Sequence, residues 1–394
     1  MSNLTPNDFI GALRRVVGHD ERVGLHEPDI SELEHRYVTE CLDSTFVSSV
    51  GPFVTRMEED IASFTGAAAA VAVSNGTSAL HVALVLAGVK PGDEVLIPAL
   101  TFVATANAVS HAGAFVHLVD SDPRNIGMSV DALREVLAGF DTRGSDVINP
   151  ATGRRVAAIV PMHALGHPLD IVALCALADE YGIPVVEDAA ESLGSYVGTQ
   201  HTGTFGRVGI LSFNGNKTIT TGGGGMIISM DAELGAHAKH LTTTAKVPHR
   251  WRFSHDEVAW NYRLPNLNAA LGVAQLERLP QFLTEKRAIA AAYERVFADL
   301  EGVQFITEPD GTTSNYWLCS VLLDDDLAGA RDEFLDVVND AGIQIRPVWD
   351  LMCDLPMYAN APRGDLSVAR NLQSRLLSIP SSPRIARSLP EAHA

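Results

Sequence analysis

With 394 residues, the chain is longer than one hydrophobic core usually supports, so its length favours two domains. Hydrophobic residues make up 46% and charged residues 20% of the sequence, which places it among soluble globular proteins. The formal net charge of −19, without any run of lysine or arginine, argues against nucleic acid or an anionic membrane surface as the main partner.

The cysteines and the apolar segments indicate the compartment. Four cysteines lie far apart and form no CxxC pair, at positions 41, 175, 319 and 353. A disulfide framework or a zinc site is therefore not expected, no metal is predicted, and a reducing cytoplasm is the expected location. The most apolar window, residues 67–88, is interrupted by Ser74, Asn75 and His81, so we predict no membrane span.

The predicted elements begin with helices and continue as an alternating pattern. The first residues have the pattern of a short amphipathic helix, and Ser31 with Glu34 forms a capping box for a helix that extends to about Leu42. A Gly-Pro turn then precedes a third helix at 55–65. Strands are expected at 70–73, 94–97, 115–119 and 156–160, and helices at 78–87, 104–111, 130–138 and 170–181. These strand-then-helix units predict a mostly parallel sheet with helices on both faces.

The rest of the chain has a different texture. Residues 140–155 are polar and contain Gly and Pro, so we expect a surface excursion there. After about residue 246, a polar and aromatic loop leads into a long helix at 267–299, which Pro280 is expected to interrupt. Strands at 303–306 and 318–323 and a helix at 329–341 follow without the earlier alternation. This order predicts a large α/β domain at 1–250 and a smaller α+β domain at 251–394.

Residues 185–230 contain the most informative pattern. One apolar strand, 183–186, is followed by Glu187 and Asp188, and a second strand, 208–213, is followed by Lys217. A single lysine at a strand-to-loop transition is usually solvated. Here its neighbours are small, its flanks are apolar, and an acid stands at another strand end, where α/β sheets bind ligands. A lysine held there can lose its proton through desolvation and serve as a Schiff-base nucleophile.

Three further stretches follow predicted strands. The motif SNGTS at 74–78 places Gly76 and the free N–H groups of a helix start where a phosphate can bind, although such residues are more often a simple cap. Phe102 stands where its ring can stack on a flat ligand. The glycines at 222–225 lack the spacing of a nucleotide-binding motif and are interpreted as a turn. A phosphate site, a stacking aromatic, an acid for a pyridine nitrogen and a reactive lysine are together what pyridoxal 5′-phosphate requires.

Four longer motifs carry a resemblance to a known family. They are EDAAESLGSYVG…GTFGRVGILSFNGNKTITTGGGGM, SNGTSALHVAL, PGDEVLIPALTFVATANAV and WNYRLPNLNAALGVAQLERL. Through these motifs, nearly the whole chain resembles the DegT/StrS-type sugar-nucleotide aminotransferases. The resemblance implies the fold-type I architecture of pyridoxal phosphate enzymes, with a mostly parallel seven-stranded sheet in the large domain. The segment LHEPDISELEHRYVTECLDSTFVSSVGPFV and the loop KVPHRW are most similar to the subgroup that acts on UDP-linked 4-keto-6-deoxy sugars in legionaminic acid or bacillosamine pathways.

The resemblance also implies roles for individual residues. Lys217 would bind the cofactor as a Schiff base and, once released, carry the proton between the amino-acid Cα and the cofactor. Asp188 would pair with the protonated pyridine nitrogen, because a carboxylate beside a cation stays ionised even when buried. Asn261 would reach the phosphate bound by the partner subunit, so a homodimer with shared active sites is implied. Phosphate contacts and ring stacking would come from Gly76, Thr77, Ser78, Ser212 and Phe102.

Three positions depart from the pattern of many relatives. Glu191 stands where many have Gln or His beside the phenolic oxygen of the cofactor, and repulsion predicts that it is protonated or turned away. Asn214 stands where many have His, and Cys353 stands where His is common. These differences bear on the sugar more than on the cofactor chemistry.

The implied reaction transfers the amino group of L-glutamate to the C4 ketone of a nucleotide-linked sugar. UDP-2-acetamido-2,6-dideoxy-hexos-4-ulose is the expected acceptor, and surface glycan (lipopolysaccharide O-antigen) or nonulosonic acid biosynthesis is the expected pathway. A GDP- or dTDP-linked sugar, a 3-keto sugar, and a regulatory protein that binds the cofactor without turnover remain as alternatives. Candidate nucleotide-sugar contacts lie in a basic loop that can equally be solvated around a packed tryptophan: Lys246, His249, Arg250 and Trp251.

Overall fold

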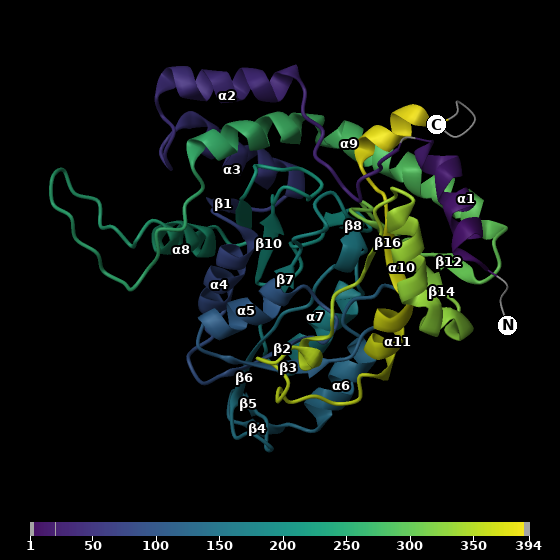
Figure 1. Ribbon diagram of the computed structural model, residues 1–394. Helices are drawn as coiled ribbons and strands as arrows, with labels where there is room; N and C mark the ends of the chain where they lie inside the picture. The colour runs from purple at the N-terminus through teal and green to yellow at the C-terminus, as the bar shows by residue number, and fades with distance from the viewer. Residues whose placement is uncertain (1–3, 20, 390–394) are drawn as a thin grey trace.

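The computed structural model describes residues 4–19 and 21–389, and its centre is a mostly parallel sheet (Figure 1). Within these residues, seven strands follow one another in the order β3-β2-β6-β7-β10-β11-β1. Backbone hydrogen bonds such as Asp188 N–H to Pro161 O, 2.9 Å, join β6 to β7 in parallel. Among these seven strands, β11 runs antiparallel to both neighbours and the other pairs are parallel, so the predicted mostly parallel seven-stranded sheet is confirmed. The bounds are β1 (Ala69–Val73), β2 (Glu94–Pro98), β3 (Phe115–Val119), β6 (Arg155–Ile159), β7 (Val186–Asp188), β10 (Val208–Ser212) and β11 (Gly225–Ser229).

Helices cover both faces of this sheet because its strands are apolar on both sides. In β2, Val95 and Ile97 enter the core of one face, whereas Leu96 enters the core of the other. The first face carries α4 (Gly76–Leu86), α5 (Val103–His111) and α8 (Ala232–Thr242). The second carries α3 (Pro52–Thr65), α6 (Val130–Ala138), α7 (Ile171–Glu180) and the first half of α9 (Asn266–Ala298). This is the three-layer α/β architecture predicted for the large domain.

A second core combines the two ends of the chain. An antiparallel sheet of order β12-β14-β16-β15 packs with α1, α10 and the second half of α9, as Figure 1 shows on the right. The N-terminal helix therefore shares the core of the C-terminal elements, whereas the sequence had grouped it with the large domain. A domain boundary at residue 250 stays a prediction. The bounds are α1 (Pro6–Val17), β12 (Val303–Phe305), β14 (Cys319–Leu323), α10 (Arg331–Asp340), β15 (Arg346–Pro347), α11 (Ser367–Arg375) and β16 (Leu376–Ile379).

One local expectation, the interruption at Pro280, needs correction, and the surface excursion at 140–155 gains a detail. Helix α9 continues through Pro280, because buried side chains on both sides of the proline, such as Leu279 and Phe282, hold the helix and offset the lost hydrogen bond. The surface excursion at 140–155 contains a hairpin, β4 (Asp141–Arg143) and β5 (Asp146–Ile148), because β5 pairs with the start of β6. The smaller elements are α2 (Glu32–Ser44), β8 (Tyr196–Val197), β9 (Gln200–His201), β13 (Thr312–Thr313), η1 (Ala164–Gly166), η2 (Asp325–Ala330), η3 (Met352–Asp354) and η4 (Pro383–Ser388). None of the helices in the described residues combines the length and apolarity that a membrane crossing requires.

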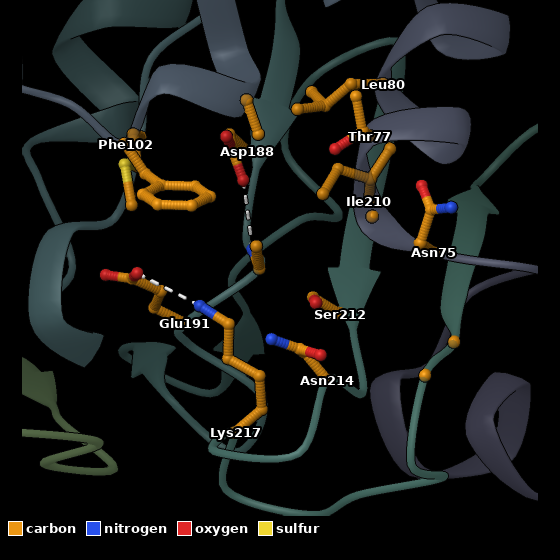
Figure 2. Close-up of a pocket in the computed structure, with 16 residues that line it drawn as sticks. Asn75, Thr77, Leu80, Phe102, Asp188, Glu191, Ile210, Ser212, Asn214 and Lys217 are labelled. Carbon is orange, nitrogen blue, oxygen red and sulfur yellow. Dashed lines mark hydrogen bonds and ion pairs between the residues drawn. The ribbon is translucent and has the colours of Figure 1, made fainter.

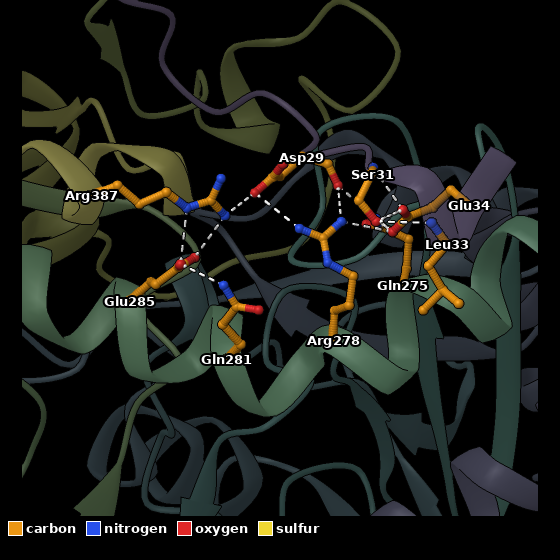
Figure 3. Close-up of polar contacts among 9 residues, drawn as sticks. All are labelled: Asp29, Ser31, Leu33, Glu34, Gln275, Arg278, Gln281, Glu285 and Arg387. Carbon is orange, nitrogen blue, oxygen red and sulfur yellow. Dashed lines mark hydrogen bonds and ion pairs between the residues drawn. The ribbon is translucent and has the colours of Figure 1, made fainter.

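A polar network holds the segment before α2 onto α9 (Figure 3). Arg278 on α9 lies between Asp29, at 3.2 Å, and Glu34, at 2.9 Å, and Gln275 donates a second hydrogen bond to Glu34 at 2.6 Å. Arg387 on η4 pairs with Asp29 from the other side. Burial raises the pKa of Glu34, but hydrogen bonds from Ser31, Arg278 and Gln275 outweigh it and lower that pKa below its ordinary value.

We predict that Arg278→Met lowers the free energy of unfolding by about 3 kcal/mol, because it leaves the buried Glu34 carboxylate without its cation. Since the pKa of Glu34 is lowered in the folded state, its contribution is present above the ordinary glutamate value and lost as pH falls through the lowered value. The deficit should therefore shrink in acid. Chemical denaturation at several pH values measures this.

Arg387→Met is the matched control, because this arginine belongs to the same network but its side chain is 45% exposed. An exposed ion pair contributes less than about 1 kcal/mol. Equal losses in the two variants would contradict the assignment of Arg278 as the buried member.

Candidate active site

A cavity of about 250 Å³ opens at the carboxyl edge of the sheet (Figure 2). Its walls come from the ends of β7 and β10, from the loops after β1, β2 and β6, and from the loop before the antiparallel β11, which starts at the same edge. The predicted site residues that line it are Gly76, Thr77, Phe102, Asp188, Glu191, Ser212, Asn214 and Lys217. The other lining residues are Asn75, Leu80, Ala104, Met162, Ala190, Ile210, Gly223 and Gly224.

Lys217 and Glu191 form an ion pair inside this cavity. The Lys217 Nζ lies 3.0 Å from Glu191 Oε1, and the side chains are 11% and 1% exposed. The other oxygen, Oε2, accepts a hydrogen bond from the Leu165 N–H at 2.8 Å. Burial raises the pKa of Glu191, and the nearby Lys217 charge and this N–H oppose that rise. The carboxyl group thus points at the lysine, an arrangement that the sequence had not predicted.

Asp188 is the last residue of β7, and it is buried at the wall of the cavity. Its carboxylate accepts hydrogen bonds from the Thr105 hydroxyl at 2.8 Å and the Ala190 N–H at 3.2 Å. Burial raises the pKa of Asp188, and the two donors and the positive charge of Lys217 act against it. A buried carboxylate is stabilised best by a cation, so the geometry suits a protonated ring nitrogen placed against it.

The opposite end of the cavity is built to admit an anion close to the backbone. Helix α4 starts at Gly76, so the backbone N–H groups of Gly76 and Thr77 have no acceptor within the helix and can bind an anion. A Cβ on Gly225 would lie 2.6 Å from the Asn75 carbonyl carbon, and a Cβ on Gly76 would lie 3.1 Å from the Ser212 Cβ. Only glycine therefore fits at position 225, where β11 meets the start of α4, and a side chain at position 76 would crowd Ser212 of β10.

One member of the predicted phosphate set has other surroundings. Ser78 lies outside the cavity lining, its N–H bonded to the Asn75 side chain at 2.8 Å and its hydroxyl 3.4 Å from that of Ser74. Of the glycines at 222–225, the first three form the predicted connection and Gly225 begins β11, and Gly223 and Gly224 also line the cavity. Ser212 faces the cavity at the end of β10, as predicted from its place in the strand.

Phe102 and Asn214 flank the cavity on the solvent side. Phe102 is the residue before α5, its side chain is 47% exposed, and its ring centroid lies 6.4 Å from that of Trp349. Figure 2 shows its ring directed into the same space as Asp188 and Lys217. Asn214 lies beside Ser212 and donates a weak hydrogen bond to Asn216 at 3.4 Å.

The remaining predicted contacts lie outside the cavity of their own chain. Asn261 is exposed and pairs with Thr243. The basic loop is part of an arm, residues 246–258, that projects from the body beyond α8 in Figure 1. Trp251 is 70% exposed, so it is not the packed residue of the alternative interpretation. The arm carries Lys246, His249, Arg250 and Trp251.

The residues present fit a pyridoxal phosphate group. The cavity offers a lysine amine, an acid held at the inner wall, an aromatic ring at the mouth and a helix start with close glycine approaches, and these are the four functional groups that the cofactor needs. Because two buried acids, Asp188 and Glu191, already lie near Lys217, the cavity also disfavours a further anion near the lysine and directs a phosphate toward the α4 end.

Comparisons with known proteins decide the family. The model of the DegT/DnrJ/EryC1/StrS aminotransferase family matches residues 28–389. The chain belongs to this family. It is 36% identical over 363 residues to GDP-perosamine synthase of Caulobacter vibrioides, covering 91% of this chain and 93% of that protein.

Two further relatives agree with this assignment. The chain is 30% identical over 346 residues to UDP-N-acetyl-3-dehydro-alpha-D-glucosamine 3-aminotransferase of Acidithiobacillus ferrooxidans, covering 87% of this chain and 86% of that protein. The crystal structure of the aminotransferase TlmJ from Streptoalloteichus hindustanus matches with a TM-score of 0.84 at 30% identity, covering 94% of this chain and 96% of that one. The chain is a pyridoxal phosphate-dependent sugar aminotransferase.

Sequence reasoning missed three residues next to the lysine and the acid. Thr105 stands three positions after Phe102, so its place in the first turn of α5 was a signal that it lies on the same side of the helix, where it bonds Asp188. Leu165 and Trp317 contact Glu191 and Lys217 from segments far away in the chain. Nothing local marks these two residues.

We predict that Asp188→Asn flattens the pH dependence of stability in the cofactor-free protein. Burial raises the pKa of Asp188, so the folded protein binds this proton more tightly than the unfolded chain does. Stability therefore falls as pH rises from the ordinary aspartate value through the raised one. Asparagine cannot ionise, so the melting temperature of the Asp188→Asn variant should fall less than that of the parent over the same pH interval.

The control is Asp179→Asn, on the exposed end of α7, which should keep the parental slope. Parallel slopes for the parent and Asp188→Asn would contradict the prediction.

Proposed function

We propose that the chain moves the amino group of L-glutamate to the C4 ketone of a nucleotide-linked 4-keto-6-deoxy sugar in the cytoplasm. The observation that carries this proposal is the convergence of Lys217, Glu191 and Asp188 in one cavity at the sheet edge. Bound pyridoxal phosphate supplies the electron-withdrawing ring that stabilises negative charge at the reacting carbon. The protein supplies the groups that orient it and move the proton.

Each residue has a defined task in this proposal. The Lys217 amine attaches the cofactor and, when free, takes and returns the proton at its Nζ. The Asp188 carboxylate keeps a proton on the pyridine nitrogen, and the Thr105 hydroxyl holds that carboxylate in place. Phe102 orients the ring from the mouth of the cavity. The start of α4, with Gly76 and Thr77, and Ser212 and Asn214 at the end of β10 hold the phosphate end.

The nucleotide and the position of the keto group define the substrate. The opening segment and the arm favour UDP-2-acetamido-2,6-dideoxy-hexos-4-ulose, within surface glycan or nonulosonic acid biosynthesis. The relative from Caulobacter is named for a GDP-linked product, and the relative from Acidithiobacillus is named for C3 of a UDP-linked sugar. Members of this family therefore differ in both the nucleotide and the position of the keto group.

We further propose a homodimer whose sites are shared. Asn261 and the arm lie outside the cavity of their own chain, which supports a role in the site of a neighbouring copy. Large apolar side chains also stand exposed around the end of α2, as an interface between copies would require. They are Leu42, Phe46, Val47 and Val50, which are 42% to 68% exposed.

We predict that Lys217→Ala abolishes transamination and the visible absorbance of the lysine-bound cofactor. The parent should lose that absorbance when L-glutamate is added and regain it with the matching ketosugar. A panel of UDP-, GDP- and dTDP-linked 4-keto and 3-keto sugars identifies the acceptor by the recovered absorbance.

Lys90→Ala, at an exposed turn, is the control and should behave as the parent does. Activity that survives in Lys217→Ala would contradict the role of the lysine. A parent that binds the cofactor but does not respond to any amino donor would favour the regulatory alternative.

Hybrid dimers test the shared site. Lys217→Ala and Asn261→Ala should each be inactive or strongly impaired as homodimers. If Asn261 acts across the interface, each hybrid dimer contains one intact site. Random pairing makes about half of the dimers hybrid, so about a quarter of all sites are intact. Activity of purified, differently tagged hybrids measures this. Inactive hybrids would place Asn261 in its own subunit's site or in neither.

A further inference from the structure

The ammonium of Lys217 has a second neighbour besides Glu191. Its Nζ lies 3.9 Å from the centroid of the Trp317 ring, a distance at which a cation is attracted to the negative face of an indole. Trp317 is only 4% exposed and does not belong to the residues that line the cavity. The free lysine therefore lies between a carboxylate and an aromatic face, with little water around either contact.

Trp317 is itself fixed by hydrogen bonds at three points. Its indole N–H donates to the carbonyl of Asn216, the residue before the lysine, at 2.6 Å. Its backbone N–H donates to the Asn315 side chain at 2.8 Å, and its carbonyl accepts from Lys286 of α9 at 3.0 Å. The same ring thus holds the backbone before Lys217 and contacts the end of its side chain.

Asn315 joins this tryptophan to both loops of the site. Its side-chain N–H groups donate to the carbonyls of Glu191 and Leu193, each at 2.9 Å, and its amide lies 3.2 Å from the Thr218 hydroxyl. Glu191 is the acid itself, and Thr218 directly follows the lysine in sequence. The segment 314–318 is therefore built against the pair formed by Lys217 and Glu191.

Backbone strain marks the same place. Tyr316, immediately before Trp317, has φ of 45°, and Leu165, whose N–H holds Glu191, has φ of 58°. Such left-handed conformations are unfavourable for bulky residues and persist where the surroundings enforce them, commonly at functional sites. The two strained segments contact each other, since Leu318 N–H donates to Leu165 O at 3.2 Å. Both contacts of the lysine are thus held by strained backbone.

We propose that Trp317 is a positioning residue that keeps the free amine of Lys217 facing the cofactor cavity. A lysine side chain has a flexible four-carbon stem, and Glu191 alone fixes one point near its end. The indole face adds a second point, and the indole N–H fixes where the stem begins. This inference rests on the proposed role of Lys217 and adds to it the residue that holds the amine while it is not bonded to the cofactor.

The test compares variants that separate the ring face from the indole N–H. Trp317→Phe keeps an aromatic face, whereas Trp317→Leu removes both features. Phe305→Leu is the matched control, because Phe305 is a buried aromatic that stacks on Tyr316 and Tyr293 but not on the lysine. Melting temperatures record any general loss of stability in each variant.

The main readout is the rate at which cofactor-free protein attaches pyridoxal phosphate to Lys217. Attachment forms a C=N bond between Nζ and the aldehyde carbon and releases the oxygen as water, which stopped-flow absorbance follows. Borohydride then reduces that bond, and peptide mass spectrometry locates the labelled lysine. A single turnover with L-glutamate provides the second readout.

We expect Trp317→Leu to slow attachment and single turnover on the order of tenfold, because it loses a largely desolvated cation–π contact. Trp317→Phe should stay within about threefold of the parent, and Phe305→Leu should match the parent even if its melting temperature falls. The inference is wrong if Trp317→Leu attaches the cofactor as fast as the parent, or if Phe305→Leu slows attachment as much as Trp317→Leu does. A parent labelled at another lysine would instead overturn the proposed role of Lys217.

If Trp317→Leu does not fold, the same attachment rate is measured in protein that contains fluorinated tryptophan. Fluorine weakens the negative face of the ring while preserving its shape and its N–H. The label enters all four tryptophans, so it is compared in the parent and in Trp317→Phe. We expect slower attachment in the labelled parent and no change in labelled Trp317→Phe. An equal effect in both proteins, or none in the parent, would overturn the inference.

Discussion

The ion pair between Lys217 and Glu191 is the constraint around which this structure is arranged. Two charges removed from water are costly unless partners in fixed positions compensate them. Leu165 supplies an N–H to the carboxylate, Trp317 supplies a ring face to the ammonium, and Asp188 adds a second enclosed acid nearby. A lysine that must act on a bound cofactor thus needs support from the C-terminal elements as well as from the sheet.

Local patterns in the sequence predicted the part of this site that the sheet contributes. Asp188, Ser212 and Lys217 each follow an apolar strand, and topology alone brings the ends of parallel strands to one edge. Trp317 and Leu165 were beyond such reasoning, because their contacts depend on how segments distant in sequence pack. The pairing of Glu191 with the lysine was missed for a related reason, since its direction is set by the backbone of Leu165 and not by its own neighbours.

The same division holds for the fold. Alternating apolar runs identified the strands of the large sheet, and boundaries such as those of β3 and α6 were predicted to the residue. Helix propensity failed at Pro280, where burial on both sides of α9 outweighs the missing hydrogen bond. The position of α1 could not be predicted, because an apolar helix face can pack against either hydrophobic core. The path of the chain in three dimensions brings α1 to the C-terminal sheet.

The pairing of β1 with β11 has a consequence for how the protein matures. Ala69 and Ser229 are register partners, so the first strand of the large sheet has no place to dock until the polypeptide is more than half made. The cavity takes longer still, because Glu191 and Lys217 acquire their surroundings only when residues 314–318 have left the ribosome. Pairings so distant in sequence form slowly. Loading with pyridoxal phosphate is therefore a late event in biogenesis, after translation of nearly the entire polypeptide.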